Sequence, residues 1–420
     1  MSTEETPRTI GSDAWLGAGN YEPGSAWNTR ATDFFKVVKW GAVAAIASRL
    51  RGGISCSFAD KFAIGNFNIV RRLDFDDGVS WVARVRLPPI IDGVADRGAL
   101  PVSQAIEMEA ASIKFLRLKT SIPIPEVHAY DSSPDNEVGS PFILMDYIHG
   151  TVASELRELQ GSAYGLFGTP EQDRKFRDQM ARIQAIVASL QFPKIGCLYY
   201  NKDKDDFFIG KDLETGQGPW SSSTDYYDAL TSYLLKSVSE DYLRESTSFM
   251  LPSILNYLLR IQGEEQDGPF RLTNRDFGAH NILVNGDFDI VGVIDFDGVM
   301  AAPLEVVAQY PDSSFLDVEP PGVVETRPLA LERIASTLPK LESFKEMLAK
   351  WEGAEAGEVK VADRLGSTSA CAYQEKSFNR HYTMENVKEQ VNQLKYNVGC
   401  KKCGAKVKNG MKCGKCGAQN

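Results

Sequence analysis

The stretch that most constrains this chain of 420 residues lies between positions 272 and 298, LTNRDFGAHNILVNGDFDIVGVIDFDG. Two short runs of β-branched residues flank the dipeptide Asn285-Gly286, which readily takes the positive φ angles of a hairpin turn. The chain is therefore expected to fold back on itself at this dipeptide.

Three oxygen-bearing side chains gather around this predicted hairpin. Asn281 and Asp295 fall at its open end, and Asp276 lies on the loop that leads in, in an Asp-x4-Asn spacing. Magnesium that bridges nucleotide phosphates prefers carboxylate or amide oxygens, while an acceptor hydroxyl needs a carboxylate to take its proton. The spacing is typical of a kinase catalytic loop, with Asp276 as the base and Asn281 and Asp295 as magnesium ligands.

This segment resembles the aminoglycoside phosphotransferase family of kinase-like small-molecule phosphotransferases, particularly its fungal members. Their loop has the form H-x-D-F-x-x-H-N-I-L-V and leads to G-V-I-D, and the resemblance covers about positions 36–341. Asn274 stands where the family has a histidine that braces the loop, and an amide can also make structural hydrogen bonds. The resemblance implies an α+β fold of the two-lobed protein-kinase type, with a small β-rich N-lobe and a mostly helical C-lobe.

Positions 64–87 predict three consecutive strands with a glycine at the first bend. Backbone amides near Gly65, with Asn66 and Asn68, are expected to lie against nucleotide phosphates. Arg84 stands where kinases carry a strand lysine, and arginine keeps that charge and can bind phosphate oxygens bidentately.

Positions 103–119 have the apolar spacing of a helix and are closed by two prolines. The resemblance implies that Glu109, on this helix, pairs with the strand cation. Glu107 is the alternative, because both glutamates could face inward on a slightly rotated helix.

The segment PFILMDYIHG, positions 141–150, resembles the strand and hinge that join the two lobes of a kinase. The resemblance places Met145 beside the adenine pocket, and the Asp146 carbonyl and Ile148 amide opposite the adenine ring. It implies ATP and Mg²⁺ as cofactors.

The composition agrees with a cytosolic enzyme. No apolar stretch approaches the length needed to span a bilayer, and the start, MSTEETPRT, is polar and unlike a signal peptide. We therefore expect no membrane partner and a cytoplasmic location. The seven cysteines argue against a disulfide framework in that compartment, so Cys56, Cys197 and Cys371 are interpreted as isolated thiols.

Positions 151–266 predict mainly helices, where the family inserts the helices of its acceptor site. The net charge of −10 favours a cationic acceptor such as an aminoglycoside, an amino alcohol or an amino sugar.

The last 25 positions contain a second motif, Cys-x2-Cys-x9-Cys-x2-Cys, formed by Cys400, Cys403, Cys413 and Cys416. Four thiolates in two such turns make a closed tetrahedral site that suits structural Zn²⁺, with iron as the alternative in a rubredoxin-like knuckle. Metal binding would supply most of the folding free energy of so short a unit.

This tail is basic, with seven lysines and no acidic residue from position 392 onward. Its charge could attract nucleic acid, an acidic protein or the acidic lobe of the same chain. Because only Tyr396 could stack on a base, a protein partner is favoured over nucleic acid.

The predicted function is an ATP-dependent phosphotransferase that transfers the γ-phosphate to a hydroxyl group of a small cationic molecule. The alternative is a pseudokinase or nucleotide-sensing scaffold that recruits partners through its zinc-knuckle tail. The expected organisation is an N-terminal extension, an N-lobe, a C-lobe with a helical acceptor-site insertion, a linker with a helix, and a zinc-knuckle unit, at positions 1–35, 36–145, 146–350, 351–395 and 396–420.

Overall fold

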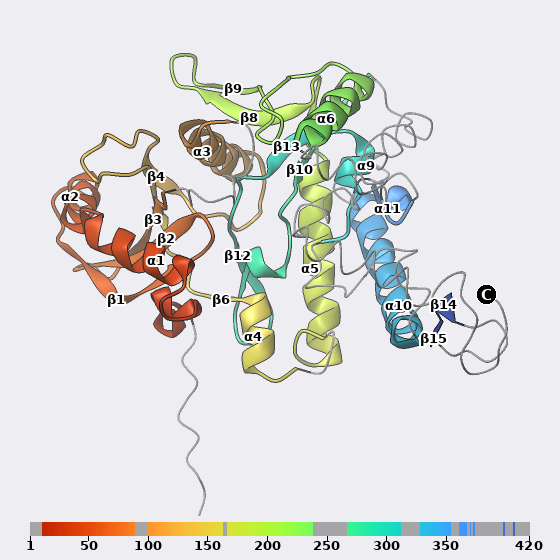
Figure 1. Cartoon of the computed structure of the whole chain (residues 1–420), viewed down its shortest axis with the longest axis horizontal. Helices are drawn as coiled ribbons and strands as arrows, with labels where there is room; N and C mark the ends of the chain where they lie inside the picture. The colour runs from red at the N-terminus through yellow and green to blue at the C-terminus, as the bar shows by residue number, and fades with distance from the viewer. Residues whose placement is uncertain are drawn as a thin grey trace, which may run out of the picture.

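The computed structural model describes residues 11–88, 100–162, 166–237, 267–311, 328–353 and 361–367, with positions 370, 373, 398–399 and 406–407. These residues form two lobes, with the β-rich N-lobe at the left of Figure 1 and the mainly helical C-lobe at the right. The expected two-lobed α+β fold is confirmed. No helix among these residues is both long and apolar enough to cross a membrane.

The N-lobe is a five-stranded antiparallel sheet in the order β1-β2-β3-β5-β4, with helices on both faces. Its elements are η1 (Gly11–Ala14), η2 (Gly17–Asn20), α1 (Ala26–Val37), α2 (Trp40–Leu50), β1 (Cys56–Ile64), β2 (Asn68–Phe75), β3 (Ser80–Arg86), α3 (Val102–Lys119), β4 (Val127–Asp131) and β5 (Phe142–Asp146).

Alternation along β3 decides which side chains face the polar residues that lie between the lobes around Arg84, Glu109, Asp276 and Asp295, here called the cleft. Trp81 and Ala83 join the apolar cluster beneath α2, whereas Val82 lies in a separate cluster on the opposite face. Because successive strand residues point to opposite faces, Arg84 shares the face of Val82. The sheet therefore directs the guanidinium of Arg84 away from the α2 side and toward α3.

The C-lobe combines a second five-stranded sheet, in the order β7-β10-β13-β8-β9, with a smaller sheet, β12-β11-β6. Its elements are β6 (Thr151–Val152), α4 (Ala153–Leu159), α5 (Pro170–Ala188), β7 (Gln191–Phe192), β8 (Gly196–Asn201), β9 (Asp206–Ile209), α6 (Ser223–Ser237), β10 (Phe270–Asn274), η4 (Ala279–Asn281), β11 (Ile282–Val284), β12 (Ile290–Val293), β13 (Val299–Ala302), α9 (Leu304–Val307), α10 (Pro328–Trp351) and α11 (Val361–Arg364).

The long helix α5 runs through the middle of the C-lobe, beside α10 (Figure 1). It begins with a capping box, in which the Thr169 side chain accepts from the Gln172 amide and the Gln172 side chain accepts from the Thr169 amide. Phe176 and Met180 on this helix are fully buried. This core supports the loops that carry the polar residues of the cleft.

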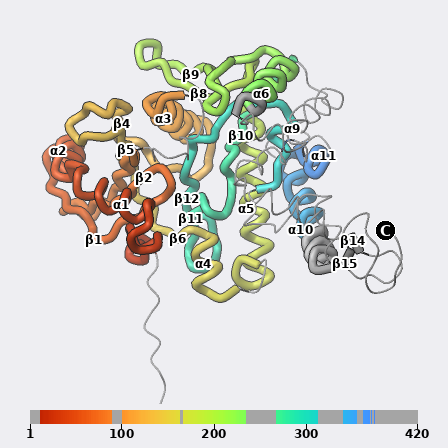
Figure 2. Tube along the Cα trace, in the orientation of Figure 1, coloured from red at the N-terminus to blue at the C-terminus, as the bar shows by residue number. Residues whose placement is uncertain are grey.

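The predicted hairpin is present as β11 and β12, and β11 also pairs with β6, the first strand after the hinge (Figure 2). Its turn differs from the predicted two-residue form. Asn285 accepts from the amides of Asp287 and Asp289, and the left-handed residue is Phe288, with φ 59°. Phe288 is fully buried against Phe176, so tertiary packing sets this longer turn.

Replacing Phe176 by alanine should lower the free energy of unfolding by about 3–5 kcal/mol, because it opens a cavity beside the Phe167 and Phe288 rings. Leu118→Ala is the matched control, since Leu118 is 67% exposed and its loss should change stability by about 0.5 kcal/mol or less. Equal effects of the two substitutions in denaturant titrations would contradict this core assignment.

Candidate functional site

Arg84 lies at the centre of the cleft and contacts groups from three parts of the chain. Its Nη1 donates to the Glu109 carboxylate on α3, and its Nη2 lies 3.1 Å from Asp295 Oδ1, just after β12. Its side chain is only 11% exposed. One guanidinium therefore joins the N-lobe sheet, the helix α3 and the C-lobe.

Asn68 supplies a third contact to this guanidinium. With the amide oriented to accept, Asn68 Oδ1 lies 2.8 Å from both Nε and Nη2 of Arg84. The Asn68 side chain is thus engaged with the arginine, and its predicted contact with nucleotide phosphates stays a prediction.

The structure distinguishes between the two glutamates of α3. Glu109 is buried at Arg84, whereas Glu107 is exposed and accepts from the Ser132 hydroxyl at 2.8 Å. Burial raises the pKa of Glu109 to about 7. The positive charges of Arg84 and Arg86 lower this pKa, whereas the negative charges of Asp295 and Asp297 raise it. The carboxyl groups of Glu109, Asp295 and Asp297 therefore lie close enough to influence one another in this part of the structure.

Asp295 has a left-handed backbone, with φ 63°. Aspartate tolerates this conformation better than most residues, and such conformations cluster at functional sites. Its side chain is 30% exposed, so the Asp295 side chain is accessible to solvent beside Arg84.

Asp276 and Asn281 are brought together at the end of β10. Asn281 Nδ2 donates to the Asp276 carbonyl at 2.9 Å and lies 3.3 Å from Asp276 Oδ2. These bonds turn Asn281 Oδ1 the other way, and no partner for that oxygen occurs among the residues that the structure describes. His280, which sequence reasoning did not single out, places Nε2 3.4 Å from Asp276 Oδ1.

Asn274 braces this loop in the way expected of an amide that replaces the family histidine. Its Nδ2 donates to the Asp295 carbonyl at 3.0 Å, and its Oδ1 accepts from the Asp276 amide at 3.0 Å. The side chain thus fixes the segment of the predicted base relative to that of the predicted metal ligand.

Arg275 is a second anchor of the loop, and no pattern in the sequence indicates this role. Its guanidinium lies 3.2 Å from the carboxylates of both Asp212 and Glu214, which are buried. Its backbone amide and Nε both donate to the Gly298 carbonyl. A pair of acids two positions apart in a region without clear periodicity is indistinguishable, in sequence, from a solvated turn.

Cys197 lies beside Asp212, with its sulfur accepting from the Leu213 amide at 3.4 Å. Burial raises the pKa of the Cys197 thiol to about 12. The thiol therefore stays protonated at neutral pH and packs as a small apolar group, as expected of an isolated cysteine.

The hinge side of the cleft contains Met145, which is buried with Val82, Ile106 and Ile143. The carboxylate of Asp146 accepts from the Glu126 amide and lies 2.8 Å from His128 Nε2. The roles predicted for the Asp146 carbonyl and for Ile148 stay predictions.

The turn between β1 and β2 is stabilised by a hydrogen bond within the turn and by another from helix α1. The Gly65 amide donates to the Asn68 carbonyl, and Arg30 of α1 donates to the Asn66 carbonyl at 2.9 Å. The Gly65 amide is therefore used within the turn rather than directed to a ligand, and phosphate binding by Gly65 and Asn66 stays a prediction.

The side chains of the cleft fit magnesium better than a softer metal. Asn281 Oδ1 and the Asp295 carboxylate are hard oxygen donors on adjacent strand ends, and magnesium commonly takes one or two protein oxygens with waters in its other positions. Within the described residues, no group of three or more His, Cys, Asp or Glu side chains is placed to hold a metal.

The predicted zinc ligands Cys400, Cys403, Cys413 and Cys416 lie outside the described residues, so the zinc site stays a prediction.

Asp212→Ala should lower the free energy of unfolding by about 3 kcal/mol, because it removes one carboxylate from the buried Arg275 guanidinium. Asp33→Ala is the control: its ion pair with Lys36 is exposed on both sides, so the loss should be about 0.5 kcal/mol or less. Urea titration of both variants is the measurement, and a loss for Asp212→Ala as small as the control's would show that Arg275 is not anchored in this way.

A sequence profile described as the phosphotransferase enzyme family matches residues 72–306, more than half of the chain. The match begins in β2 and ends in α9, so it includes Arg84, Glu109, Asp276 and Asp295, whereas Asn68 lies just before it.

Curated relatives are fungal. A subtelomeric hrmA-associated cluster protein of Aspergillus fumigatus is 30% identical over 164 residues, which are 37% of this chain and 29% of the relative. Altered inheritance of mitochondria protein 9, mitochondrial, of Candida dubliniensis is 26% identical over 229 residues, or 51% of this chain and 35% of the relative. The chain thus spans about a third of the length of these relatives.

Two solved structures are also similar. Aminoglycoside phosphotransferase APH(4)-Ia, bound to ADP and hygromycin B, has a TM-score of 0.44 and 16% identity, with 83% of this chain and 96% of that chain covered. Macrolide 2'-phosphotransferase type I has a TM-score of 0.42 and 12% identity, with 84% and 96% covered.

The expected cytoplasmic location was wrong. Several of the yeast relatives are named as mitochondrial proteins, which points away from a purely cytoplasmic location.

Proposed function

The chain belongs to the phosphotransferase enzyme family, and from this and the geometry of the cleft we propose that it transfers the γ-phosphate of ATP to a hydroxyl group of a small molecule. The observation that carries the proposal is the hydrogen-bonded unit of Asp276, Asn281 and Asn274, which is joined through the Asp295 carbonyl to the loop that contacts Arg84. This arrangement offers a base and a cation in one cleft, as phosphoryl transfer requires.

In the proposed reaction the acceptor oxygen bonds to the γ-phosphorus while the bond to the β–γ bridging oxygen breaks, and ADP leaves. The proton of the acceptor hydroxyl passes to the Asp276 carboxylate. Asn281 holds the Asp276 segment through its amide nitrogen, so the carboxylate stays oriented toward the acceptor. Arg84 supplies positive charge from the N-lobe, where it can form two bonds to phosphate oxygens once it leaves Asp295.

Magnesium, held by Asn281 and Asp295, would neutralise charge on the β- and γ-phosphate oxygens. Two observations support its binding: the partly exposed carboxylate of Asp295 and the amide oxygen of Asn281 turned away from the loop. The net charge of −10 favours the approach of a cationic acceptor, for which an aminoglycoside-like molecule, an amino alcohol or an amino sugar is proposed.

A nucleotide-sensing scaffold remains the second candidate, because Arg84 is held by carboxylates from both lobes and could lock an inactive cleft. The two candidates differ in whether the acceptor is phosphorylated. A screen of amino alcohols, aminoglycosides and sugars for ATP turnover separates them.

Asp276→Asn should retain nucleotide affinity and lower turnover about 10²- to 10⁴-fold, the usual contribution of a positioned base. The isosteric amide keeps an oxygen for Asn281, so the loop should stay folded. Asp287→Asn, in the exposed β11–β12 turn, is the control and should keep full turnover. Wild-type turnover by Asp276→Asn would exclude Asp276 as the base.

The C-terminal tail is proposed to bind one structural zinc ion and to contact a protein partner. The four-cysteine spacing supports this, as does the pairing of β14 (Val398–Gly399) with β15 (Lys406–Val407), which flank Cys400 and Cys403 in the sequence. Four thiolates leave no open position for substrate, so this zinc has no role in phosphoryl transfer.

Plasma mass spectrometry should find one equivalent of zinc in the intact protein and none after deletion of positions 396–420, with nucleotide affinity unchanged. Cys403→Ser should lose the metal, whereas Cys56→Ser, in β1, should keep it. The absence of stoichiometric zinc after expression in zinc-replete medium would contradict the site, and iron in its place would identify the rubredoxin-like alternative.

A further inference from the structure

The short segment 11–17 bridges the two lobes at the hinge side of the cleft. A Cβ atom at Gly11 would lie 3.4 Å from the Gly150 carbonyl, just before β6. At its other end Gly17 packs so closely on Phe62 of β1 that a Cβ atom there would lie 2.6 Å from the ring. Gly17 also has φ +57°, which disfavours a side chain. The segment is thus fitted between the N-lobe sheet and the start of the C-lobe.

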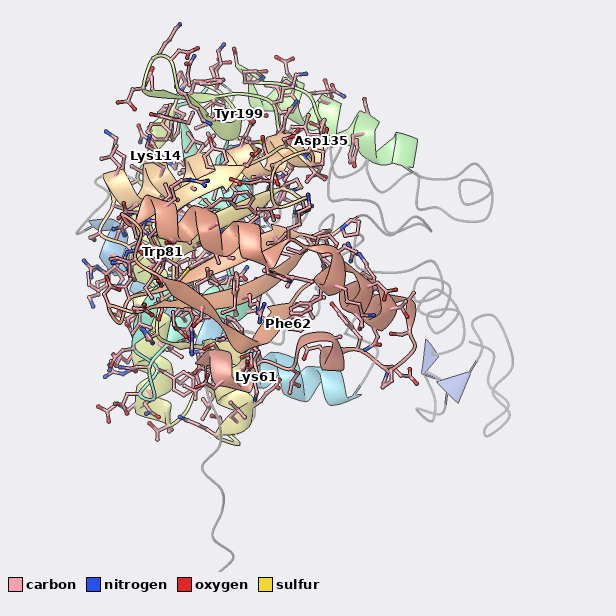
Figure 3. The ribbon with its side chains drawn as sticks, turned by 90° about the vertical axis from the view of Figure 1, so that its left-hand side faces the viewer. Lys61, Phe62, Trp81, Lys114, Asp135 and Tyr199 are labelled. Atoms are coloured by element: carbon pink, nitrogen blue, oxygen red, sulfur yellow. The ribbon has the colours of Figure 1, made fainter. Side chains whose placement is uncertain are left out.

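Polar contacts hold this segment in place. Ser12 is buried, its amide donates to the Tyr147 hydroxyl at 3.2 Å, and that hydroxyl donates to Ser12 Oγ at 2.9 Å. Arg72 of β2 also donates to Ser12 Oγ, and Lys61 donates to the Asp13 carbonyl. Lys61 and Phe62 are neighbours on β1, at the lower edge of the N-lobe in Figure 3. Groups from the hinge and from two strands therefore fix η1.

Trp15, the next residue after η1, packs on the apolar cluster that contains Val82 and Met145. Its ring meets the Tyr147 ring edge to face, with centroids 6.4 Å apart. Met145 and the hinge after it are the residues predicted to lie beside the adenine ring of the nucleotide. An indole and a purine are flat aromatic groups of similar size, and both gain by leaving water for a slot between apolar side chains.

We propose that Trp15 occupies the base-binding end of the cleft and that segment 11–17 must release it before a nucleotide can bind. The inference rests on the proposed function, since it assigns a competitor to that same site. The apparent nucleotide affinity is then the intrinsic affinity multiplied by the fraction of molecules in which the segment is released. Trp15 thereby sets the nucleotide concentration at which the enzyme becomes active.

Calorimetric titration of ADP in magnesium buffer into wild-type protein, Trp15→Ala and Leu16→Ala tests the proposal. Leu16 is the matched control, because it adjoins Trp15 and is 68% exposed. Trp15→Ala should bind ADP about tenfold more tightly than wild type if the segment is released in about one molecule in ten, and Leu16→Ala should bind as wild type does. Thermal unfolding of each variant confirms that it is folded.

A second readout follows the segment itself. Amide hydrogen exchange at positions 12–17 of the wild-type protein should become faster when ADP is added, because the contacts of Ser12 and Gly17 are given up. Equal or weaker ADP binding by Trp15→Ala, or unchanged exchange in ADP-saturated wild type, would overturn the proposal. Absence of ADP binding in all three folded proteins would instead contradict the proposed function, and with it this inference.

Discussion

The ion pairs of Arg84 are the interaction on which the rest of the cleft depends. The side chain starts on a strand of the N-lobe, contacts Glu109 on α3 and reaches Asp295 in the C-lobe. Breaking either contact leaves a buried or half-buried charge without its partner, which is costly in a region of low dielectric constant. The relative position of sheet, helix and C-lobe is therefore coupled to one guanidinium.

The C-lobe side of this arrangement is fixed by hydrogen bonds rather than by apolar packing alone. Asn274 links the Asp276 segment to the Asp295 segment, and Arg275 ties the same loop to the buried acids Asp212 and Glu214. Polar groups held in this way rarely adopt a second arrangement, because each would lose its partner on moving. The predicted base and metal ligands are thus positioned before any ligand arrives.

Much of this arrangement could be predicted from local signals. Asn281 and Asp295 lie next to the paired ends of β11 and β12, as strand alternation and a turn predict, and the Ile294 amide donates to the Asn281 carbonyl. The choice between Glu109 and Glu107 could not be made from sequence, because it depends on the rotation of α3 against the sheet.

Other features depend on contacts between distant segments, which leave no local pattern. The turn of the hairpin is set by burial of Phe288 against α5, although Asn285-Gly286 alone favours a shorter turn. The anchoring of Arg275 by Asp212 and the placement of Trp15 on the Met145 cluster join residues far apart in the chain. Residues 1–35 were predicted as an N-terminal extension, and this division stays a prediction; the described part of them packs against the N-lobe sheet and the hinge.

We propose that the residues around Arg84, Asp276, Asn281 and Asp295 bind ATP together with a divalent cation. Isothermal titration of ATP, once with magnesium and once with excess chelator, is the test, because the triphosphate adds negative charge beside Glu109 and Asp295, which are already paired with Arg84. We expect saturable ATP binding with magnesium, its loss with chelator, and weaker magnesium-dependent binding by Asp295→Asn. Equal affinity for ATP with magnesium and with chelator would contradict it.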